Sequence, residues 1–163
     1  MTIEGLNDDF RDLLVQFVDA GVESVIVGAY ALSFHGAPRA SGDIDLFIRP
    51  ADDNARRVVT ALIAFGAPLE AAGITMNDFT QPGTVYQVGV PPRRVDVMTQ
   101  ISGVTFDEAW ASRVTAEVEG RSVGFIDRVH LLRNKEATGR PKDLADIARL
   151  RRMKPRDGES APR

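Results

Sequence analysis

The sequence predicts one α/β (α+β) domain in which a mixed β-sheet is flanked by helices. Its 163 residues suit one domain of ordinary size and leave too little for two substantial ones. Segments with helical and with strand periodicity alternate along the chain, without an internal repeat or an interdomain linker. We expect the domain to span residues 1–152. Residues 153–163 are expected to form a disordered basic tail, because they combine positive charge with Pro, Gly and Ser.

The first half of the chain predicts five elements. They are expected where apolar residues recur with helical spacing, where β-branched and aromatic residues gather, and where Asn, Gly or Pro mark boundaries. In order, they are a helix after Asn7 ending at Gly21, a strand over 25–27 ending at Gly28, a short helix over 29–35, a strand over 43–49, and a core-facing helix marked by Ala55, Val58, Val59, Leu62 and Ile63 and closed by Gly66. From residue 67 to 83 the pattern fails, which indicates a long loop or irregular flap.

The second half predicts strands and helices with clear boundary signals. A capping-box pattern, a Glu-Gly turn and a proline at a helix start supply these signals. The elements are strands over 84–90 and 94–101 joined at 91–93, a helix opened by Thr105 and Glu108, a hairpin over 114–125 turning at 119–120, a helix capped by Asp127, and a last helix from Pro141 through Leu150.

Composition and charge exclude several classes of protein. The absence of cysteine excludes disulfides, thiolate metal sites, Fe–S clusters and cysteine nucleophiles. Residues 1–150 carry fifteen Lys and Arg against twenty-one Asp and Glu, which is unsuited to nonspecific polyanion binding. The N-terminus lacks a signal-peptide pattern, and no run of eighteen apolar residues occurs. We therefore expect a cytoplasmic protein that does not associate with membranes.

Three acidic residues lie within apolar segments that predict strands. Asp43 and Asp45 are two residues apart, so on a strand they project from one face about 7 Å apart. Asp96 lies in a second such segment. Three strand carboxylates can hold two divalent metal ions about 4 Å apart, and Mg²⁺ prefers hard oxygen ligands. One alternative is that Asp43 ends a loop and Asp45 is a solvated strand residue. The alternative for Asp96 is an ion pair with Arg93, Arg94 or another nearby cation.

Gly28 marks a second feature, because it ends a predicted strand and opens a predicted helix. The backbone N–H groups near Ala29 and Tyr30, together with the positive end of the helix, are suited to phosphate oxygens. Asp96 would in that case be placed to act as a general base toward an acceptor hydroxyl.

Three segments around these residues resemble the nucleotidyltransferase superfamily, whose fold is shared with DNA polymerase beta. They are Val27-Gly28-Ala29-Tyr30-Ala31-Leu32, His35-Gly36-Ala37-Pro38-Arg39 and Ser41-Gly42-Asp43-Ile44-Asp45-Leu46. In that superfamily a Gly-Ser or Gly-Gly turn binds the triphosphate, a D-x-D pair binds metal, and a third strand acid completes the site. The resemblance therefore implies that Gly28 and Ala29 lie at the phosphates, that Asp43 and Asp45 bind Mg²⁺, and that Asp96 is the third carboxylate and metal ligand.

Residues 134–146 are similar to the Lys-rich and D-x-x-D segments of AbiEii-type nucleotidyltransferases, some of which are abortive-infection or toxin–antitoxin proteins. This resemblance implies that Lys142 contacts the nucleotide triphosphate, with Lys135 and Arg140 as weaker candidates. Arg39 is a further candidate for a phosphate contact, or else pairs with an acid of the site. The alternative for the D-x-x-D segment is a solvated helix start whose acids favour the helix dipole.

These observations lead to one leading hypothesis and two alternatives. The leading hypothesis is a Mg²⁺-dependent enzyme, with two ions and with Mn²⁺ as a substitute, that transfers NMP from an NTP such as ATP to a hydroxyl of an RNA end, a protein or a small molecule. A toxin–antitoxin or abortive-infection system, with a cognate partner protein, is its expected context. Ala29 replaces the usual second Gly or Ser, and the chain ends soon after residue 150. The first alternative is therefore a weak or inactive member of the superfamily that acts as a partner-binding module, such as an antitoxin. The second alternative is a structural domain whose acidic residues form only salt bridges.

Overall fold

The computed structural model describes residues 6–38, 42–90 and 93–155. Within these ranges six strands form one mixed sheet in the order β3-β4-β2-β1-β6-β5. The strands are β1 (Ser24–Val27), β2 (Asp43–Ile48), β3 (Val85–Val88), β4 (Arg94–Met98), β5 (Val114–Val118) and β6 (Arg121–Phe125). The pairs β2–β4 and β1–β6 are parallel, and the other neighbouring pairs are antiparallel. The predicted mixed α/β class is therefore confirmed.

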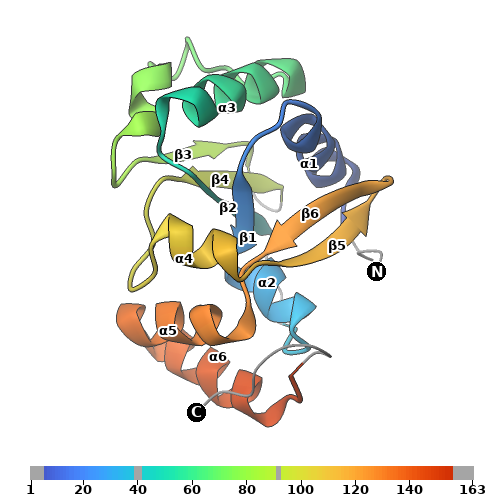
Figure 1. Cartoon of the computed structure of the whole chain (residues 1–163), viewed down its shortest axis with the longest axis vertical. Coiled ribbons are helices and arrows are strands. Elements are labelled where there is room, and N and C mark those ends of the chain that lie inside the picture. Colours follow the sequence, from blue (N-terminus) through green and yellow to red (C-terminus); the bar gives the residue numbers. More distant parts are fainter. Residues whose placement is uncertain (1–5, 39–41, 91–92, 156–163) are drawn as a thin grey trace.

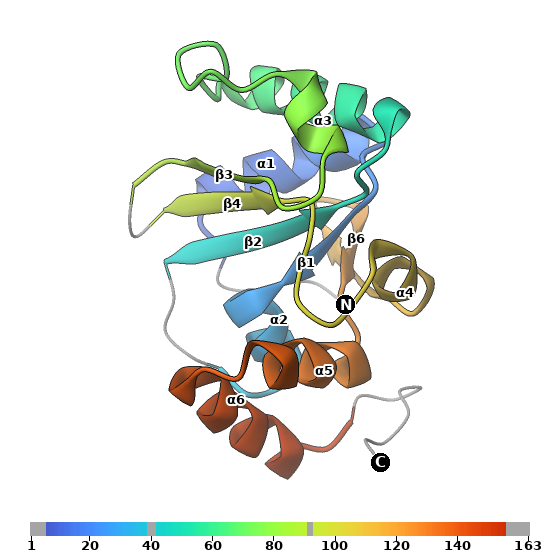
Figure 2. The same ribbon diagram turned by 90° about the vertical axis from the view of Figure 1, so that its left-hand side faces the viewer.

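Helices cover both faces of the sheet. They are α1 (Asp8–Asp19), α2 (Gly28–Phe34), α3 (Asp52–Phe65), α4 (Phe106–Ala111), α5 (Arg128–Thr138) and α6 (Pro141–Arg152), with a short 3-10 helix η1 (Met76–Thr80). Figure 1 shows the order of these elements along the chain. Figure 2 shows α1 and α3 on one side of the sheet and α2, α5 and α6 on the other. None of the helices in the described part of the chain has the length and apolar character needed to cross a bilayer.

Strand β2 contributes side chains both to the core and to the predicted site. Its side chains alternate between the two faces of the sheet, so Ile44, Leu46 and Ile48 point one way and are fully buried. Asp43 and Asp45 point the other way and are partly exposed. The site face is therefore the one that carries α2, α5 and α6.

Most of the predicted boundaries are confirmed, with local reasons. The Asn7 side chain accepts a hydrogen bond from the backbone N–H of Phe10, which fixes the start of α1. The Thr105–Glu108 capping box is present, and Pro141 occupies the first turn of α6. Gly66 ends α3 in the left-handed conformation at φ 97°.

Three expectations need correction. Ile63 was expected in the core but is 62% exposed. At 100° per residue it lies on the side of α3 away from the buried residues Ala55, Val58, Ala61 and Leu62. The segment 67–83 is more ordered than a flap, since it holds η1, and Phe79 in η1 is fully buried. Asp127 precedes α5 as predicted, but its side chain makes no capping hydrogen bond.

Candidate active site

The parallel pairing of β2 with β4 brings the three predicted carboxylates together. In this register Asp45 lies directly opposite Asp96, and Asp43 lies opposite Arg94. On the other side of β2, Asp45 is paired with Val27, the last residue of β1. The turn at Gly28 therefore begins beside the same carboxylates, although these residues are far apart in the sequence.

A cleft of about 720 Å³ opens over this part of the sheet. Eight of the predicted site residues line it, namely Gly28, Ala29, Asp43, Asp45, Asp96, Lys135, Arg140 and Lys142. Arg39, the ninth, lies outside the described residues. The lining also includes apolar side chains on and next to β3 and β4, namely Val85, Met98 and Ile101. The cleft thus has acids on the sheet, basic residues on α5 and α6, and an apolar side at the sheet edge.

Gly28 is required by its close approach to Asp45. It adopts φ +69°, a conformation that residues with a side chain rarely adopt. A Cβ atom at this position would lie 2.1 Å from Oδ2 of Asp45, well inside the contact limit. Gly28 and Ala29 form the first turn of α2, whose N–H groups have no acceptor within the helix. A bound anion is one partner that such groups can take.

Two of the three carboxyl groups, those of Asp45 and Asp96, have raised pKa values. Burial, reinforced by the negative charge of Asp96 and a hydrogen bond with it, raises the pKa of Asp45 to about 7. Burial also raises the pKa of Asp96, although Arg94 offsets part of the effect. Both shifts favour the neutral form of these carboxyl groups relative to an exposed aspartate. A cation near these two groups would offset the upward shift, because it favours their ionised forms.

Arg94 interacts with two of the three carboxylates, those of Asp43 and Asp96. Its Nη2 lies 2.6 Å from Oδ2 of Asp43, and its Nε lies 3.5 Å from Oδ1 of Asp96. The ion pair that was considered as an alternative role for Asp96 is thus present, at the upper end of the ion-pair range. Oδ1 of Asp96 is buried and, among the described residues, accepts no hydrogen bond. The sequence signal for Arg94 is its position two residues before Asp96 on the same face of β4.

The donor chemistry of this site suits a divalent ion such as Mg²⁺, but a complete ligand set is not preformed. The buried oxygen of Asp96 and the raised pKa of Asp45 both indicate a deficit of positive charge. In the described part of the chain, however, no three His, Asp or Glu side chains are already arranged to hold a metal. Asp43 is engaged by Arg94, so Asp43 would have to leave this ion pair to join Asp45 and Asp96 on a metal.

Lys135 and the two acids of the D-x-x-D segment form a buried cluster between α5 and α6. Nζ of Lys135 lies 3.3 Å from Oδ1 of Asp143 and 3.1 Å from Oδ2 of Asp146. Both acids are almost fully buried, so the alternative of a solvated helix start is wrong. Burial by itself would raise the pKa of Asp143, but hydrogen bonds from Arg140, Thr138 and Lys135 hold that pKa well below its usual range. The cluster links α5 to α6 and holds the ammonium group of Lys135 at the cleft.

Arg140 and Lys142 provide the exposed positive charge of the cleft. Arg140 donates from Nε to Oδ2 of Asp143 at 2.7 Å, while about half of its side chain stays exposed. Lys142 is exposed at the start of α6. Since both residues line the cleft opposite the carboxylates, they are the basic groups that a phosphate entering the cleft can reach first.

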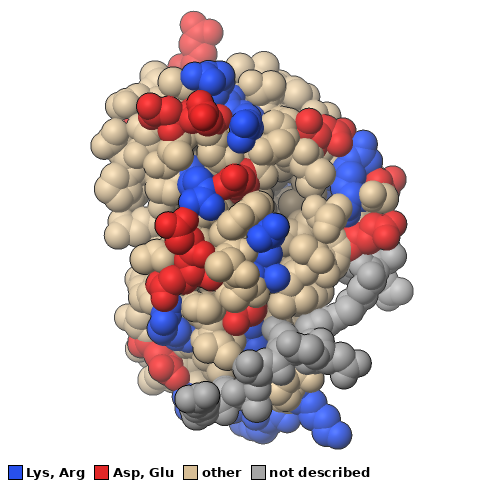
Figure 3. Space-filling model, in the orientation of Figure 1, with Lys and Arg blue, Asp and Glu red and all other residues tan. Residues whose placement is uncertain are grey.

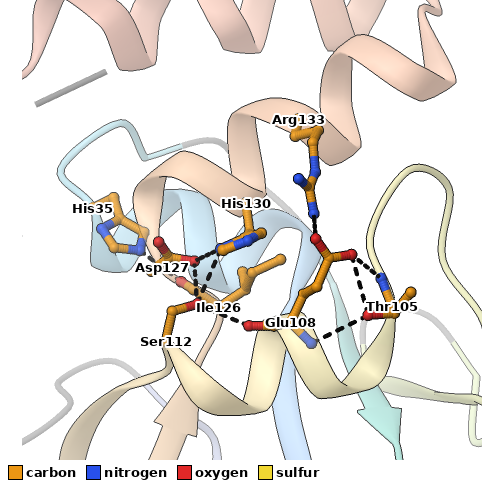
Figure 4. Close-up of polar contacts among 8 residues, drawn as sticks. All are labelled: His35, Thr105, Glu108, Ser112, Ile126, Asp127, His130 and Arg133. Carbon is orange, nitrogen blue, oxygen red and sulfur yellow. Dashed lines mark hydrogen bonds and ion pairs between the residues drawn. The ribbon is translucent and has the colours of Figure 1, made fainter. Parts of the chain in front are cut away.

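A Ser–His–Asp cluster lies away from this cleft. Oγ of Ser112 and Oδ1 of Asp127 both contact Nδ1 of His130, at 3.0 Å and 2.5 Å (Figure 4). In a catalytic triad the acid binds one ring nitrogen of the histidine and the serine hydroxyl binds the other. Here both groups contact the same nitrogen, Nδ1, so the cluster lacks the geometry of a triad. The contacts instead join the end of α4 to the start of α5.

His35, the other histidine, is also structural. It is buried, and its Nε2 lies 2.8 Å from the carbonyl oxygen of Ile126 (Figure 4). This is the backbone hydrogen bond that is typical of a histidine at a helix end, and it leaves His35 outside the residues that line the cleft.

No protein-family model matches the sequence, and no curated protein matches it. Among solved structures, the chain is similar to an antigenic nucleotidyltransferase-like protein from Paracoccidioides brasiliensis, with 18% identity and a TM-score of 0.45 over 90% of this chain and 78% of that one. It is also similar to the antibiotic-resistance factor ANT(2'')-Ia, with 17% identity and a TM-score of 0.48 over 87% of this chain and 80% of that one. Both likenesses are distant.

Proposed function

We propose that this chain is a metal-dependent nucleotidyltransferase that moves NMP from an NTP to an acceptor hydroxyl and releases pyrophosphate. One observation carries the proposal. Three carboxylates from two parallel strands, a glycine turn at a helix start, and the exposed basic residues Arg140 and Lys142 all line the same cleft. Acids and phosphate-binding groups in one cleft suit a reaction that combines a metal with a triphosphate.

In the proposed reaction Asp96 accepts the proton of the acceptor hydroxyl. The acceptor oxygen then forms a bond to the α-phosphorus, and the bond from that phosphorus to the bridging oxygen of the β-phosphate breaks. Lys142, Arg140 and the N–H groups at Gly28 and Ala29 hold the β- and γ-phosphates. Asp43, Asp45 and Asp96 would hold Mg²⁺, or Mn²⁺ in its place, which neutralises charge on the α-phosphate and on the leaving pyrophosphate.

The acceptor and the nucleotide base are the open parts of this proposal. Figure 3 shows acidic and basic side chains interspersed over one face of the molecule, with basic side chains near the last turn of α6. The excess of Asp and Glu over Lys and Arg in residues 1–150 favours a small molecule or a protein hydroxyl over a long nucleic acid, because long polyanions bind continuous basic surfaces.

The test is incubation of the full chain with each α-labelled NTP, Mg²⁺ and cell extract, followed by separation of RNA, protein and small molecules. We expect label in one of these fractions, and its loss in Asp43→Asn and Asp45→Asn. Asp12→Asn is the matched control, since Asp12 is exposed on α1 and its loss removes the same charge. Full activity of both site variants would reject the assignment of the carboxylates.

A second candidate function is a partner-binding module, such as one half of a toxin–antitoxin pair, that has lost nucleotidyl transfer. It is motivated by Ala29, which is buried in the phosphate turn and supplies no hydroxyl. Calorimetry with each NTP and Mg²⁺ separates the two candidates. Binding that Asp43→Asn abolishes favours the enzyme, whereas no binding to any NTP favours the module.

A further inference from the structure

Arg94 occupies a position between two of the three carboxylates. It contacts Asp43 at 2.6 Å and Asp96 at 3.5 Å. Both contacts follow from the sheet, because Arg94 is the register partner of Asp43 and lies two residues before Asp96 on the same face of β4. A cation at this point offsets the negative charge that these acids place in a partly buried site.

We propose that Arg94 is a built-in counter-cation that competes with a divalent metal ion for Asp43 and Asp96, and so lowers the affinity of the site for metal. The inference rests on the proposed function, because it assumes that the carboxylates bind metal. It goes further by assigning to Arg94 a role as a positioning residue that sets how readily the site takes up the ion.

The competition follows from distance and charge. An Mg²⁺ ion requires ligand oxygens at about 2.0 to 2.1 Å. At 2.6 Å from Oδ2 of Asp43, the Arg94 guanidinium lies where an ion bridging Asp43 and Asp96 would feel strong repulsion. The ion therefore has to displace the guanidinium before Asp43 joins the other two carboxylates.

The structure leaves Arg94 a way to move aside. Its side chain is 32% exposed and lines the cleft, whereas the backbone of Arg94 is fixed by the β2–β4 ladder. Rotation of the side chain takes the guanidinium into the cleft without disturbing the strand. A triphosphate in the cleft would meet the displaced guanidinium, which is well suited to phosphate oxygens.

Three other basic side chains near the carboxylates, those of Lys135, Arg140 and Arg93, contact other acids. Lys135 is held by Asp143 and Asp146, and Arg140 is hydrogen-bonded to Asp143. Arg93 precedes Arg94 in the sequence but is 60% exposed and lies 3.5 Å from Asp9 of α1. Arg93 is therefore a matched control, because its substitution removes the same charge one residue away without breaking the contacts to the carboxylates.

The experiment is a calorimetric titration of the metal-stripped full chain with Mn²⁺ alone, for the wild type, Arg94→Gln and Arg93→Gln. We expect Arg94→Gln to bind Mn²⁺ at least about threefold more tightly than the wild type, as expected for loss of a partly exposed competing ion pair. Arg93→Gln should stay within about twofold of the wild type. Thermal melts check that each variant is folded, and Arg94→Lys, for which a smaller gain is expected, replaces Arg94→Gln if the latter does not fold.

The outcomes separate this inference from the proposed function. Tighter binding only in Arg94→Gln supports the inference, including the case in which binding becomes measurable only in that variant. Equal or weaker binding in Arg94→Gln, with a wild type that binds Mn²⁺, overturns it and leaves the metal site in place. If neither the wild type nor any variant binds Mn²⁺, the metal centre of the proposed function fails, and the inference fails with it.

Discussion

Nζ of Lys135 lies 3.1 Å from Oδ2 of Asp146, and the two side chains are only 6% and 2% exposed. This pair joins α5 to α6 across the base of the candidate site, and Asp143 adds a second carboxylate to the same ammonium group. Because the pair is buried, removing one partner leaves the other charge without compensation.

We therefore predict that Lys135→Met lowers the free energy of unfolding by roughly 3 kcal/mol, as expected when one partner of a buried ion pair is removed. Urea unfolding followed by circular dichroism measures the change. Lys142→Met is the control, because Lys142 is exposed at the same cleft and its substitution should change the stability by less than about 0.5 kcal/mol. Equal effects of the two substitutions would contradict the structural role of Lys135.

Lys142→Ala should instead weaken binding of the NTP in the presence of Mg²⁺ roughly tenfold, because it removes a charged partner of the phosphates. Calorimetry measures the dissociation constant, and a thermal melt is expected to show an unchanged melting temperature. Lys154→Ala, at an exposed lysine beyond α6 that is absent from the cleft lining, is the control. An unchanged affinity in Lys142→Ala would remove Lys142 from the proposed phosphate site.

Gly28→Ala should destabilise the chain more than Gly73→Ala does. Both glycines adopt φ +69°, so each substitution carries the same backbone strain of roughly 1 kcal/mol. Only at Gly28 does the new Cβ meet Asp45, at 2.1 Å, whereas nothing lies within 4 Å at Gly73. We expect an additional loss of at least about 1 kcal/mol for Gly28→Ala in urea unfolding. Equal losses would mean that Asp45 moves aside without cost.

Glu108 predicts a pH-dependent contribution to stability. A backbone hydrogen bond from Thr105, followed by the contact with Arg133, lowers the pKa of Glu108 to about 2 from its ordinary 4.5 (Figure 4). Because the pKa is lower in the folded chain, ionised Glu108 stabilises the fold above about pH 4.5, and this contribution is lost as the pH falls toward 2. Glu108→Gln should therefore melt below the wild type at pH 6, and the gap should close between pH 4.5 and 2.

The control for this experiment is Glu117→Gln, at an exposed position on β5. Its melting temperature is expected to follow the wild type across the same pH range. A gap between Glu108→Gln and the wild type that stays constant down to pH 2 would show that the lost interaction does not depend on the charge of Glu108.

Much of the site was predictable because its signals are local. The alternation of a strand places Asp43 and Asp45 on one face whatever the strand pairs with. Gly28 between an apolar run and a helical pattern marks a strand-to-helix turn. Asn7 and Thr105 likewise identify helix starts through bonds that span three residues.

The pairings across the sheet required the tertiary structure. Alternation shows that Asp45 and Asp96 each face one side of a strand, but not that β2 and β4 are parallel neighbours with these residues opposite each other. The contact of Arg94 with Asp43 depends on the same register. Sequence spacing does not encode register between segments about fifty residues apart, because it is set by the packing of both sheet faces.

Burial was the other feature that only the fold decided. Asp143 and Asp146 have the spacing of a solvated helix start, and the sequence supports that interpretation as well as any other. Because α6 packs on α5, Asp143 and Asp146 are buried together with Lys135. Their ion pairs with Lys135 offset the cost of burying the two negative charges. Local sequence patterns specify which charged groups are present and on which face of a helix or strand each one lies. Which of these charges meet depends on the faces that pack together in the fold, and that packing involves residues far apart in the sequence.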